Sequence, residues 1–480
     1  MERVASPAGV GAPVPRSGIL VNDIHSQLNP TLVADVVRPR SLEEARAAIL
    51  RARDEGLGVS VAGGRHSMGG QQFGSGTLHL DMSGMNRVLA FDRREGWVDV
   101  EGGIQWPQLV NRLLELQQGE WPQWTIRQKQ SGADRLSLGG AFSSNVHGRG
   151  LTLEPFVSDV ESVDLLDADG ELRTCSREAN AELFRLAAGG FGLFGVVARV
   201  RLRLVRRLKL QRIVEIGEVD SLVPAFEDRI NQGFLYGDFQ YRTDARASGF
   251  LKQGVFSCYR PVEDATPMPE GQAELSKENW RELYRLAHVD PSEAFRVYAG
   301  HYRSTSGQTY WSDLHQMGLY LDGYHEELDA CLGRTTRSSE MLTELYVPRN
   351  ALPSFLSEVR DDLRRNGLPL IYGTIRLIEK DRDAFLAWAR ERRVCVTFNL
   401  CVTHDSRGVN EAVRTFRRLI DRAIGHGGSF FLTYHRWATR RQIEACYPQF
   451  EQFLRLKRAA DPDELFQSDW YRHSKEVFAR

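Results

Sequence analysis

The feature that most constrains this chain is the stretch SGADRLSLGGAFSSNVHGRG, at residues 131–150. It is rich in Gly and Ser, contains few pairs of opposite charges, and is too long for a routine turn. Gly139 and Gly140 are expected to begin a helix or a tight turn whose free N–H groups face an anion. Hydrogen bonds to the same group are expected from Ser137, Ser143, Ser144 and Asn145. The stretch therefore predicts a binding site.

Two further glycine-rich stretches flank it in the sequence. AGGRHSMGGQ, at 62–71, falls between two expected strands, where its glycines let the backbone approach phosphate or ring atoms closely. Its spacing is not GxGxxG and no helix follows at once, which disfavours a Rossmann site. AAGGFGLFGVV, at 187–197, could line an adenine or ribose pocket through backbone groups. Taken alone, the first could be a hairpin loop with a surface His and the second a helix C-cap.

The pattern of elements predicts an α+β fold. From about Val33 short strands alternate with helices, the first of which begins at a capping box of Ser41 and Glu44. An antiparallel sheet covered by helices is expected later in the chain. Its strands are expected at 368–378, 394–402 and 429–435, and its helices at 352–365, with a stop at Asn366-Gly367, and at 411–424. Earlier in the chain, a hairpin is expected to turn at Asp169-Gly170.

The length of 480 residues exceeds the size at which one hydrophobic core stops growing, so at least two domains are expected. After about Val205 the sequence becomes irregular and rich in aromatic residues. The expected divisions are a flexible leader at 1–32, a cofactor-binding domain at 33–205, a substrate or cap domain at 206–440, and a C-terminal segment at 441–480 that returns to the cofactor-binding domain.

Composition excludes several classes of function. Lys plus Arg (62) and Asp plus Glu (63) nearly cancel, so no net field favours nucleic acid or an anionic membrane as a partner. The six cysteines form no CxxC pair and no zinc-ligand spacing, so no metal is expected, and a reducing compartment is. The sequence shows neither an apolar signal region nor a run long enough to span a membrane, which predicts a cytoplasmic protein.

Together, in order and in spacing, the three glycine-rich stretches resemble the vanillyl-alcohol oxidase and p-cresol methylhydroxylase (PCMH-type) family of FAD-binding flavoproteins. The C-terminal stretch YPQFEQFLRLKRAADPDELFQSDW extends the resemblance to its sugar and aldonolactone oxidases, decaprenylphosphoryl-ribose oxidase and cytokinin dehydrogenase-like members. The resemblance implies FAD held by a two-subdomain PCMH-type domain. It also implies an 8α-histidyl bond from His66, and only one such tether, because KQSGADRLS contains no cysteine.

The same resemblance implies which residues contact FAD. The loop around His66 matches the family's GRxHS motif, and 137–148 matches its TVGGxxSxNxHG motif. The expected FAD-binding residues are Gly63, Gly64, Arg65, His66, Ser67, Met68, Gln71, Ser137, Gly139, Gly140, Ser143, Asn145, His147, Gly148, Gly192 and Val197.

Candidate catalytic residues come from the later strands. GTIRLI resembles the alditol-oxidase strand whose Arg faces the flavin, which makes Arg376 a candidate. The acidic partner that usually precedes this Arg is Thr374 here, which weakens the case for a polyol substrate. LTYHRWATRR occupies the place where related oxidases present a catalytic His or Lys, so Tyr434 and His435 are the expected acid–base groups. Each could instead satisfy a core hydrogen bond.

Two sets of residues are candidates for substrate contacts. Cys395 and Asn399 align with substrate-facing positions of decaprenylphosphoryl-ribose oxidase, although a buried structural thiol is the commoner role for such a Cys. The aromatic run at 301–327 could line a substrate tunnel, although buried aromatics are more often core. Its candidates are Tyr310, Trp311, His315, Tyr320 and Tyr324.

The expected activity is an FAD-dependent oxidation of a CH–OH group in a sugar, lactone or alcohol, or of a CH–NH group, by hydride transfer to flavin N5. The acceptor would be O₂, or a quinone or protein. Three alternatives remain open: a reductase of the same fold with non-covalent FAD, a flavin-binding protein without turnover, and a sugar-binding protein without flavin.

Overall fold

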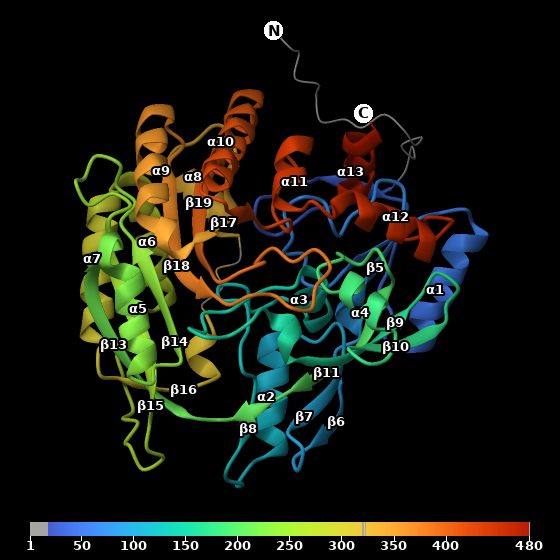
Figure 1. Ribbon diagram of the computed structural model, residues 1–480, viewed down its shortest axis with the longest axis horizontal. Coiled ribbons are helices and arrows are strands. Elements are labelled where there is room, and N and C mark those ends of the chain that lie inside the picture. Colours follow the sequence, from blue (N-terminus) through green and yellow to red (C-terminus); the bar gives the residue numbers. More distant parts are fainter. Residues whose placement is uncertain (1–17, 319–320, 322, 480) are drawn as a thin grey trace.

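The computed structural model describes residues 18–318, 321 and 323–479. Two halves lie side by side in Figure 1. One half holds a parallel three-stranded sheet and an antiparallel five-stranded sheet, both formed within the first 203 residues. The other half holds an eight-stranded antiparallel sheet formed within residues 209–430. These layers confirm the predicted α+β fold.

The three-stranded sheet is parallel because a helix and a long loop connect its strands. It contains, in spatial order, β3 (Asp35–Val37), β5 (Leu78–Asp81) and β4 (Val59–Ala62), and α1 (Leu42–Asp54) connects β3 to β4. As predicted, α1 begins at Ser41, whose hydroxyl accepts a hydrogen bond from the N–H of Glu44 at 3.2 Å. The second bond of the capping box differs, because the carboxylate of Glu44 accepts from the N–H of Arg40 instead.

The five-stranded sheet belongs to the same half. Its order is β10 (Leu172–Ser176), β9 (Val160–Leu166), β11 (Val196–Arg203), β7 (Trp97–Glu101) and β6 (Val88–Asp92). β9 and β10 form the predicted hairpin, in which Gly170 adopts a φ of +76°. The helices here are α2 (Trp106–Leu116), α3 (Leu138–Ser144) and α4 (Ala181–Ala187). A short pair, β8 (Trp124–Thr125) with β12 (Val205–Arg206), precedes the second half.

The eight-stranded sheet is antiparallel throughout. Its order is β16 (Thr309–Trp311), β13 (Lys209–Glu218), β15 (Gln253–Val262), β14 (Tyr236–Tyr241), β18 (Leu370–Ile378), β19 (Arg393–Thr403), β17 (Ser338–Pro348) and β20 (Ser429–Phe430). The last strand is shorter than the predicted 429–435, because the chain turns immediately after Phe430. Residues 431–435 therefore leave the sheet.

Helices cover both faces of this sheet. α9 (Leu352–Asn366) and α10 (Ser406–Gly425) pack on one face, and α6 (Lys277–Val289) and α7 (Pro291–Ser304) contact the other. α9 ends as predicted at Gly367, with a left-handed φ of +57°. α10 begins at Ser406 rather than at the expected Glu411, because Asp405 caps it. The remaining helices of this half are α5 (Leu222–Asn231) and α8 (Tyr324–Cys331).

The C-terminal helices lie with the N-terminal half, as Figure 1 shows. They are α11 (Arg440–Cys446), α12 (Phe450–Ala460) and α13 (Asp469–Ala479). The N–H of Gln467 donates to the carbonyl of Val59 on β4 at 2.7 Å. The carboxylate of Asp469 accepts from the backbone N–H and the hydroxyl of Ser75, both at 2.9 Å. The end of the chain thus braces the long β4–β5 connection.

Residues 18–32 are folded, whereas the sequence suggested a flexible leader through residue 32; residues 1–17 lie outside the described part. β1 (Ile19–Val21) pairs with β2 (Thr31–Val33), and we call the loop between them, residues 22–30, the strap. The carboxylate of Asp23 organises the strap by accepting hydrogen bonds from Ser26, Gln27 and Asn29. These contacts are short-range and polar, so the strap leaves no apolar periodicity in the sequence.

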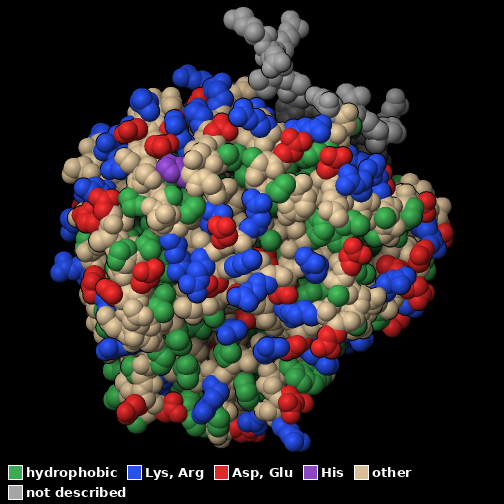
Figure 2. Space-filling model, in the orientation of Figure 1, with side chains coloured by type: hydrophobic (Ala, Val, Ile, Leu, Met, Phe, Trp, Pro, Cys, Tyr) green, Lys and Arg blue, Asp and Glu red, His purple; other side chains and the backbone are tan. Residues whose placement is uncertain are grey.

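On the face shown in Figure 2, basic and acidic side chains are interspersed, with Lys and Arg most frequent across the middle. Among the described residues, no helix combines the length and the apolar character needed to cross a membrane.

Candidate active site

A cleft opens where the β4–β5 connection meets α3 and the start of β11. It encloses about 620 Å³, solvent at its mouth included. All three glycine-rich stretches contribute to its walls. The predicted FAD-binding residues that line it are Gly63, Gly64, Arg65, His66, Ser67, Gln71, Ser137, Gly139, Gly140, Ser143, Gly192 and Val197. Lining residues not anticipated from the motifs include Met82, Gly102, Leu136 and Phe191.

The loop at 63–67 presents backbone donors to this cleft. Its five consecutive N–H groups form no hydrogen bond with any described residue. Within the run, Arg65 adopts a left-handed φ of +56°, a conformation typical of the anion-binding turns that successive N–H groups form. A Cβ on Gly63 would lie 1.9 Å from Oγ of Ser137, so glycine is required for the loop to pack against α3. Unpaired donors in a cleft of this size fit the phosphates and ring atoms of FAD.

α3 contributes differently from the prediction. It begins at the glycine pair as expected, with Ser137 as its N-cap. However, the N–H of Gly139 donates to the carbonyl of Gly102 at 2.7 Å, and that of Gly140 donates to Oγ of Ser137 at 3.2 Å. Because both donors are used inside the protein, the expectation that they face an anion is wrong. Gly139 instead anchors α3 beside the end of β7 and against Val197 of β11, and the bond of Gly140 belongs to the N-cap of α3.

Four predicted FAD-binding residues lie outside the cleft wall: Met68, Asn145, His147 and Gly148. The side chain of Met68 belongs to the hydrophobic core. Asn145 ends α3 with a left-handed φ of +48°. Its amide donates to Asp381 at 2.7 Å, and its carbonyl accepts from the indole of Trp388 at 3.0 Å. Asn145 therefore connects α3 to the second half of the molecule.

His66 lies in the wall of the cleft. Its Nδ1 is 2.7 Å from Nε2 of His25 in the strap, and its Nε2 is buried without a hydrogen-bond partner among the described residues. Burial, reinforced by the neighbouring His25, holds the pKa of His66 well below its usual value. The imidazole is therefore neutral, and in the tautomer protonated at Nδ1 its unpartnered Nε2 has the free lone pair of a nucleophile.

The face of the eight-stranded sheet opposite α9 and α10 carries polar side chains, and we call it the polar face. In the strand register, Glu344 of β17 pairs with Thr397 of β19, which pairs with Thr374 of β18. Alternation along the strands adds further members to this face. They are Glu340, Arg376, Cys395 and Asn399. Four polar atoms here are buried without a partner among the described residues: Nε and Nη1 of Arg376, Oγ1 of Thr374 and Oδ1 of Asn399.

The turn at 431–435 joins the polar face to the cleft. The side-chain amide of Gln71, in the cleft wall, donates to the carbonyls of Leu432 and Tyr434 at 2.6 and 2.9 Å. The N–H of Met68 donates to the carbonyl of Thr433 at 2.9 Å. The loop that carries His66 and the turn that carries Tyr434 are therefore held together.

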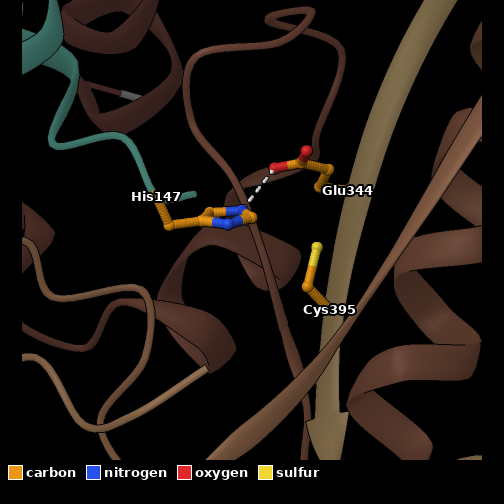
Figure 3. A group of neighbouring side chains, drawn as sticks. All are labelled: His147, Glu344 and Cys395. Carbon is orange, nitrogen blue, oxygen red and sulfur yellow. Dashed lines mark hydrogen bonds and ion pairs between the residues drawn. The ribbon is translucent and has the colours of Figure 1, made fainter. Parts of the chain in front are cut away.

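Glu344 is the centre of a buried polar cluster that the motifs did not reveal. Figure 3 shows the imidazole of His147 pointing to the carboxylate of Glu344, at 3.2 Å, with the thiol of Cys395 directed at the same group. The carboxylate also accepts hydrogen bonds from Tyr346 at 3.1 Å and Thr397 at 3.3 Å. Burial alone would raise the pKa of Glu344, but His147 above all, with smaller effects from Arg376 and Tyr346, outweighs it, so the pKa is lowered. The carboxylate is ionised in the core.

Glu344 lies in the same register row as Thr374, two strands away. A carboxylate is therefore present on this face, although Thr374 itself is not acidic. The signal was present in SSEMLTELYVP, where Glu340 and Glu344 are the acidic residues of the strand, at even spacing, and so share one face.

His147, Glu344 and Cys395 also place one potential metal-binding atom each within 4.8 Å of one another. Burial and the charge of Glu344 raise the pKa of Cys395 well above its usual value, so the thiol is protonated. With its thiol protonated, the cluster is equipped for hydrogen bonding and proton transfer.

Tyr434 and His435 are adjacent in sequence but have different surroundings. Tyr434 faces the cluster: burial and the charge of Glu344 raise the pKa of its hydroxyl well above the usual value. His435 stacks on Trp437, with ring centroids 4.0 Å apart, and meets Phe416 of α10 edge-on. Burial lowers the pKa of His435 to about 4. Of the two expected acid–base residues, only Tyr434 lies at the cluster.

The described residues of the aromatic run at 301–327 do not line the cleft. Tyr310 and Trp311 lie on the edge strand β16, where the guanidinium of Arg212 covers Tyr310 and that of Arg207 covers Trp311. His315 packs between Tyr236 and Tyr259. Tyr324 begins α8, and Tyr320 lies outside the described residues.

Comparisons with known proteins agree with this geometry. Residues 33–176 match the family model of the FAD binding domain. Over 92% of its length the chain is 24% identical to a decaprenylphosphoryl-β-D-ribose oxidase of Mycolicibacterium smegmatis, covering 94% of that protein. It is 25% identical to an L-gulono-1,4-lactone dehydrogenase of Mycobacterium tuberculosis, over 91% of this chain and 95% of the relative. It is 24% identical to cytokinin dehydrogenase 4 of Oryza sativa subsp. japonica, over 90% and 84% of the two chains.

Proposed function

We propose that this chain, an FAD-dependent oxidoreductase with its FAD-binding domain at 33–176, oxidises a small hydroxylated molecule bound between the cleft and the polar face. FAD as the cofactor and oxidation of a CH–OH or CH–NH group were expected from the motifs, and the comparisons confirm both at this level. The choice of a hydroxylated substrate and the residues that act on it are our inference.

One observation carries this proposal. Arg376, Thr374 and Asn399 hold buried polar atoms without partners on one face, beside the ionised Glu344. A buried donor or acceptor left unsatisfied costs about 1–3 kcal/mol, so a protein retains several together only where a ligand or water completes them. Hydroxyl groups can donate and accept, and thus suit a row that presents guanidinium N–H groups, a threonine hydroxyl and an amide oxygen. The row therefore supports a polar substrate with more than one hydroxyl.

The cluster supplies the proton chemistry that such an oxidation needs. When bound, FAD accepts the hydride at N5. In our assignment Glu344, held in place by His147, accepts the hydroxyl proton of the substrate, directly or through the phenol of Tyr434. Arg376 stabilises negative charge that develops on the substrate oxygen. Cys395 and Asn399 position the substrate from β19, and His435 has no direct role.

We further propose that the cofactor is tethered through His66. Support comes from the neutral imidazole in the cleft wall and from its unpartnered Nε2. A single tether is expected, because none of the described cysteines lines the cleft.

Anaerobic mixing of the purified protein with a panel of sugars, aldonolactones, alcohols and amines tests the proposed activity. We expect the visible colour of the oxidised flavin to bleach with at least one hydroxylated compound, and to return when O₂ or a quinone is admitted. If dithionite bleaches the flavin but no compound does, the protein binds flavin without turnover. If only amines bleach it, the assignment of a hydroxylated substrate is wrong.

A further inference from the structure

The strap brings a second histidine against the expected tether. Nε2 of His25 lies 2.7 Å from Nδ1 of His66, and the two ring centroids are 4.8 Å apart. A contact of this length between two ring nitrogens is a hydrogen bond, in which one imidazole donates and the other accepts. The histidine that carries the proton at this contact decides whether Nε2 of His66 has a free lone pair.

The position of His25 is fixed by the strap. The N–H of Ile24 donates to the carbonyl of Arg65 at 3.2 Å, and the amide of Asn29 donates to the carbonyl of Met68 at 2.6 Å. These bonds attach the strap to the chain on both sides of His66. The carboxylate of Asp23 accepts from the backbone N–H of His25 at 3.1 Å. His25 is therefore held in place independently of its contact with His66.

The surroundings of the pair favour movement of a proton from His66 to His25. When Nδ1 of His66 donates to His25, Nε2 of His66 is unprotonated, buried and without a hydrogen-bond partner among the described residues. Burial, with a smaller effect from His325, lowers the pKa of His25, and the negative charges of Asp23 and Glu340 offset part of this effect. Burial and His25 lower the pKa of His66 further, and only the backbone carbonyl of Arg135 acts in the opposite direction among its main influences. A proton shared by the pair is thus better accommodated on His25.

We propose that His25 is the base that activates His66 for attachment to FAD. This inference rests on the proposed tether. Nε2 of His66 forms a bond to the 8α methyl carbon, and its Nδ1 proton passes to His25. The methyl group loses one hydrogen, and the two electrons released pass through the ring system to O₂. In total, the imidazole and the methyl group each lose one hydrogen and become joined by the new N–C bond. O₂ takes up the two hydrogens and becomes H₂O₂.

The test follows covalent attachment rather than turnover. Full-length protein prepared without flavin is mixed with FAD in air, and the acid-stable fraction of flavin is measured over time for the wild type, His25→Ala, His25→Gln and His66→Ala. Gln27→Ala is the matched control, because Gln27 lies in the same strap but bonds Arg337 instead of His66. Total FAD binding is measured in parallel.

We expect His25→Ala to bind FAD and to attach it about 100-fold more slowly or worse, the scale at which a general base contributes. Added imidazole should restore part of the rate, which a purely structural role would not allow. His25→Gln should also be slow, because an amide can hydrogen-bond but cannot take up the proton. Gln27→Ala should attach FAD at the wild-type rate, and His66→Ala should attach none.

Different results would refute the tether through His66 and the role of His25 as a base. If both His25 variants attach FAD at the wild-type rate, the role of His25 is refuted and the tether stands. If His25→Ala binds no FAD, the result for His25→Gln is used instead. Normal FAD binding with slow attachment in His25→Gln supports His25 as the base, and attachment at the wild-type rate refutes it. If the wild type itself forms no acid-stable flavin, the tether is wrong, and the role of His25 is refuted with it.

Discussion

Replacing Arg376 with Met is expected to remove most of the activity while changing the stability of the protein little, because relief of two unsatisfied donors offsets the loss of positive charge near Glu344. The guanidinium is buried on the polar face, and its Nε and Nη1 have no partner among the described residues. Each unsatisfied donor costs about 1–3 kcal/mol, whereas Met fills the space without polar atoms. A cation aimed at developing negative charge contributes about 100- to 1,000-fold to a rate, so flavin reduction by substrate should slow by that factor.

The comparison for this variant is Arg207→Met. Arg207 is also buried, but its guanidinium is paired with Asp313. Removing it leaves a buried carboxylate uncompensated, so the free energy of unfolding should fall by about 3–5 kcal/mol while the rate of flavin reduction stays unchanged. Thermal unfolding and anaerobic stopped-flow measurements report the two quantities. An Arg376→Met protein that loses stability and keeps its rate would show that Arg376 is a structural residue.

Glu344→Gln is expected to slow flavin reduction by about 100- to 10,000-fold, because a positioned general base contributes that much. Glutamine preserves the shape of the side chain and can keep hydrogen bonds to Tyr346 and Thr397, but it cannot accept a proton. The flavin content of the protein should not change, since Glu344 lies outside the cleft wall. The rate constant for bleaching at saturating substrate measures the effect.

Asp362→Asn serves as the control for Glu344→Gln. Its carboxylate is also buried and charge-paired, to Arg418 at 3.0 Å, but it lies on α9 at the other face of the sheet. The Asp362→Asn substitution should lower the free energy of unfolding and leave the rate of flavin reduction unchanged. If Glu344→Gln bleaches the flavin at the wild-type rate, another group is the base, and Tyr434 would be tested first.

The parts of the fold that were predicted from sequence are those with local signals. The first turn of α1 was visible in Ser41, and the end of α9 in Gly367. The strap was missed because its stability comes from Asp23, which bonds backbone and side chains within a few residues and needs no apolar pattern. β20 was predicted too long because Phe431 and Leu432 are buried, as in a strand, although they belong to a turn.

In the candidate site, too, the residues that could be predicted are those with a local sequence signal. Loops that bind by backbone groups carry their signal in glycine, so the cleft around His66 could be located from the motifs. Glu344 could not be selected in this way, because its importance depends on a register that brings it into line with Thr374 across β19. The sequence also could not show that Tyr434 lies at the cluster around Glu344 and that His435 does not. Which of two neighbours faces a site depends on the local backbone, and a turn has no fixed alternation.

The most direct test of a tethered FAD in this cleft is the visible spectrum of the purified protein, recorded before and after acid precipitation, for the wild type and for His66→Ala. We predict flavin absorbance that stays with the precipitated wild-type chain and is released into solution from His66→Ala. Flavin released equally from both proteins would contradict the covalent bond, and a colourless wild-type protein would contradict the account as a whole.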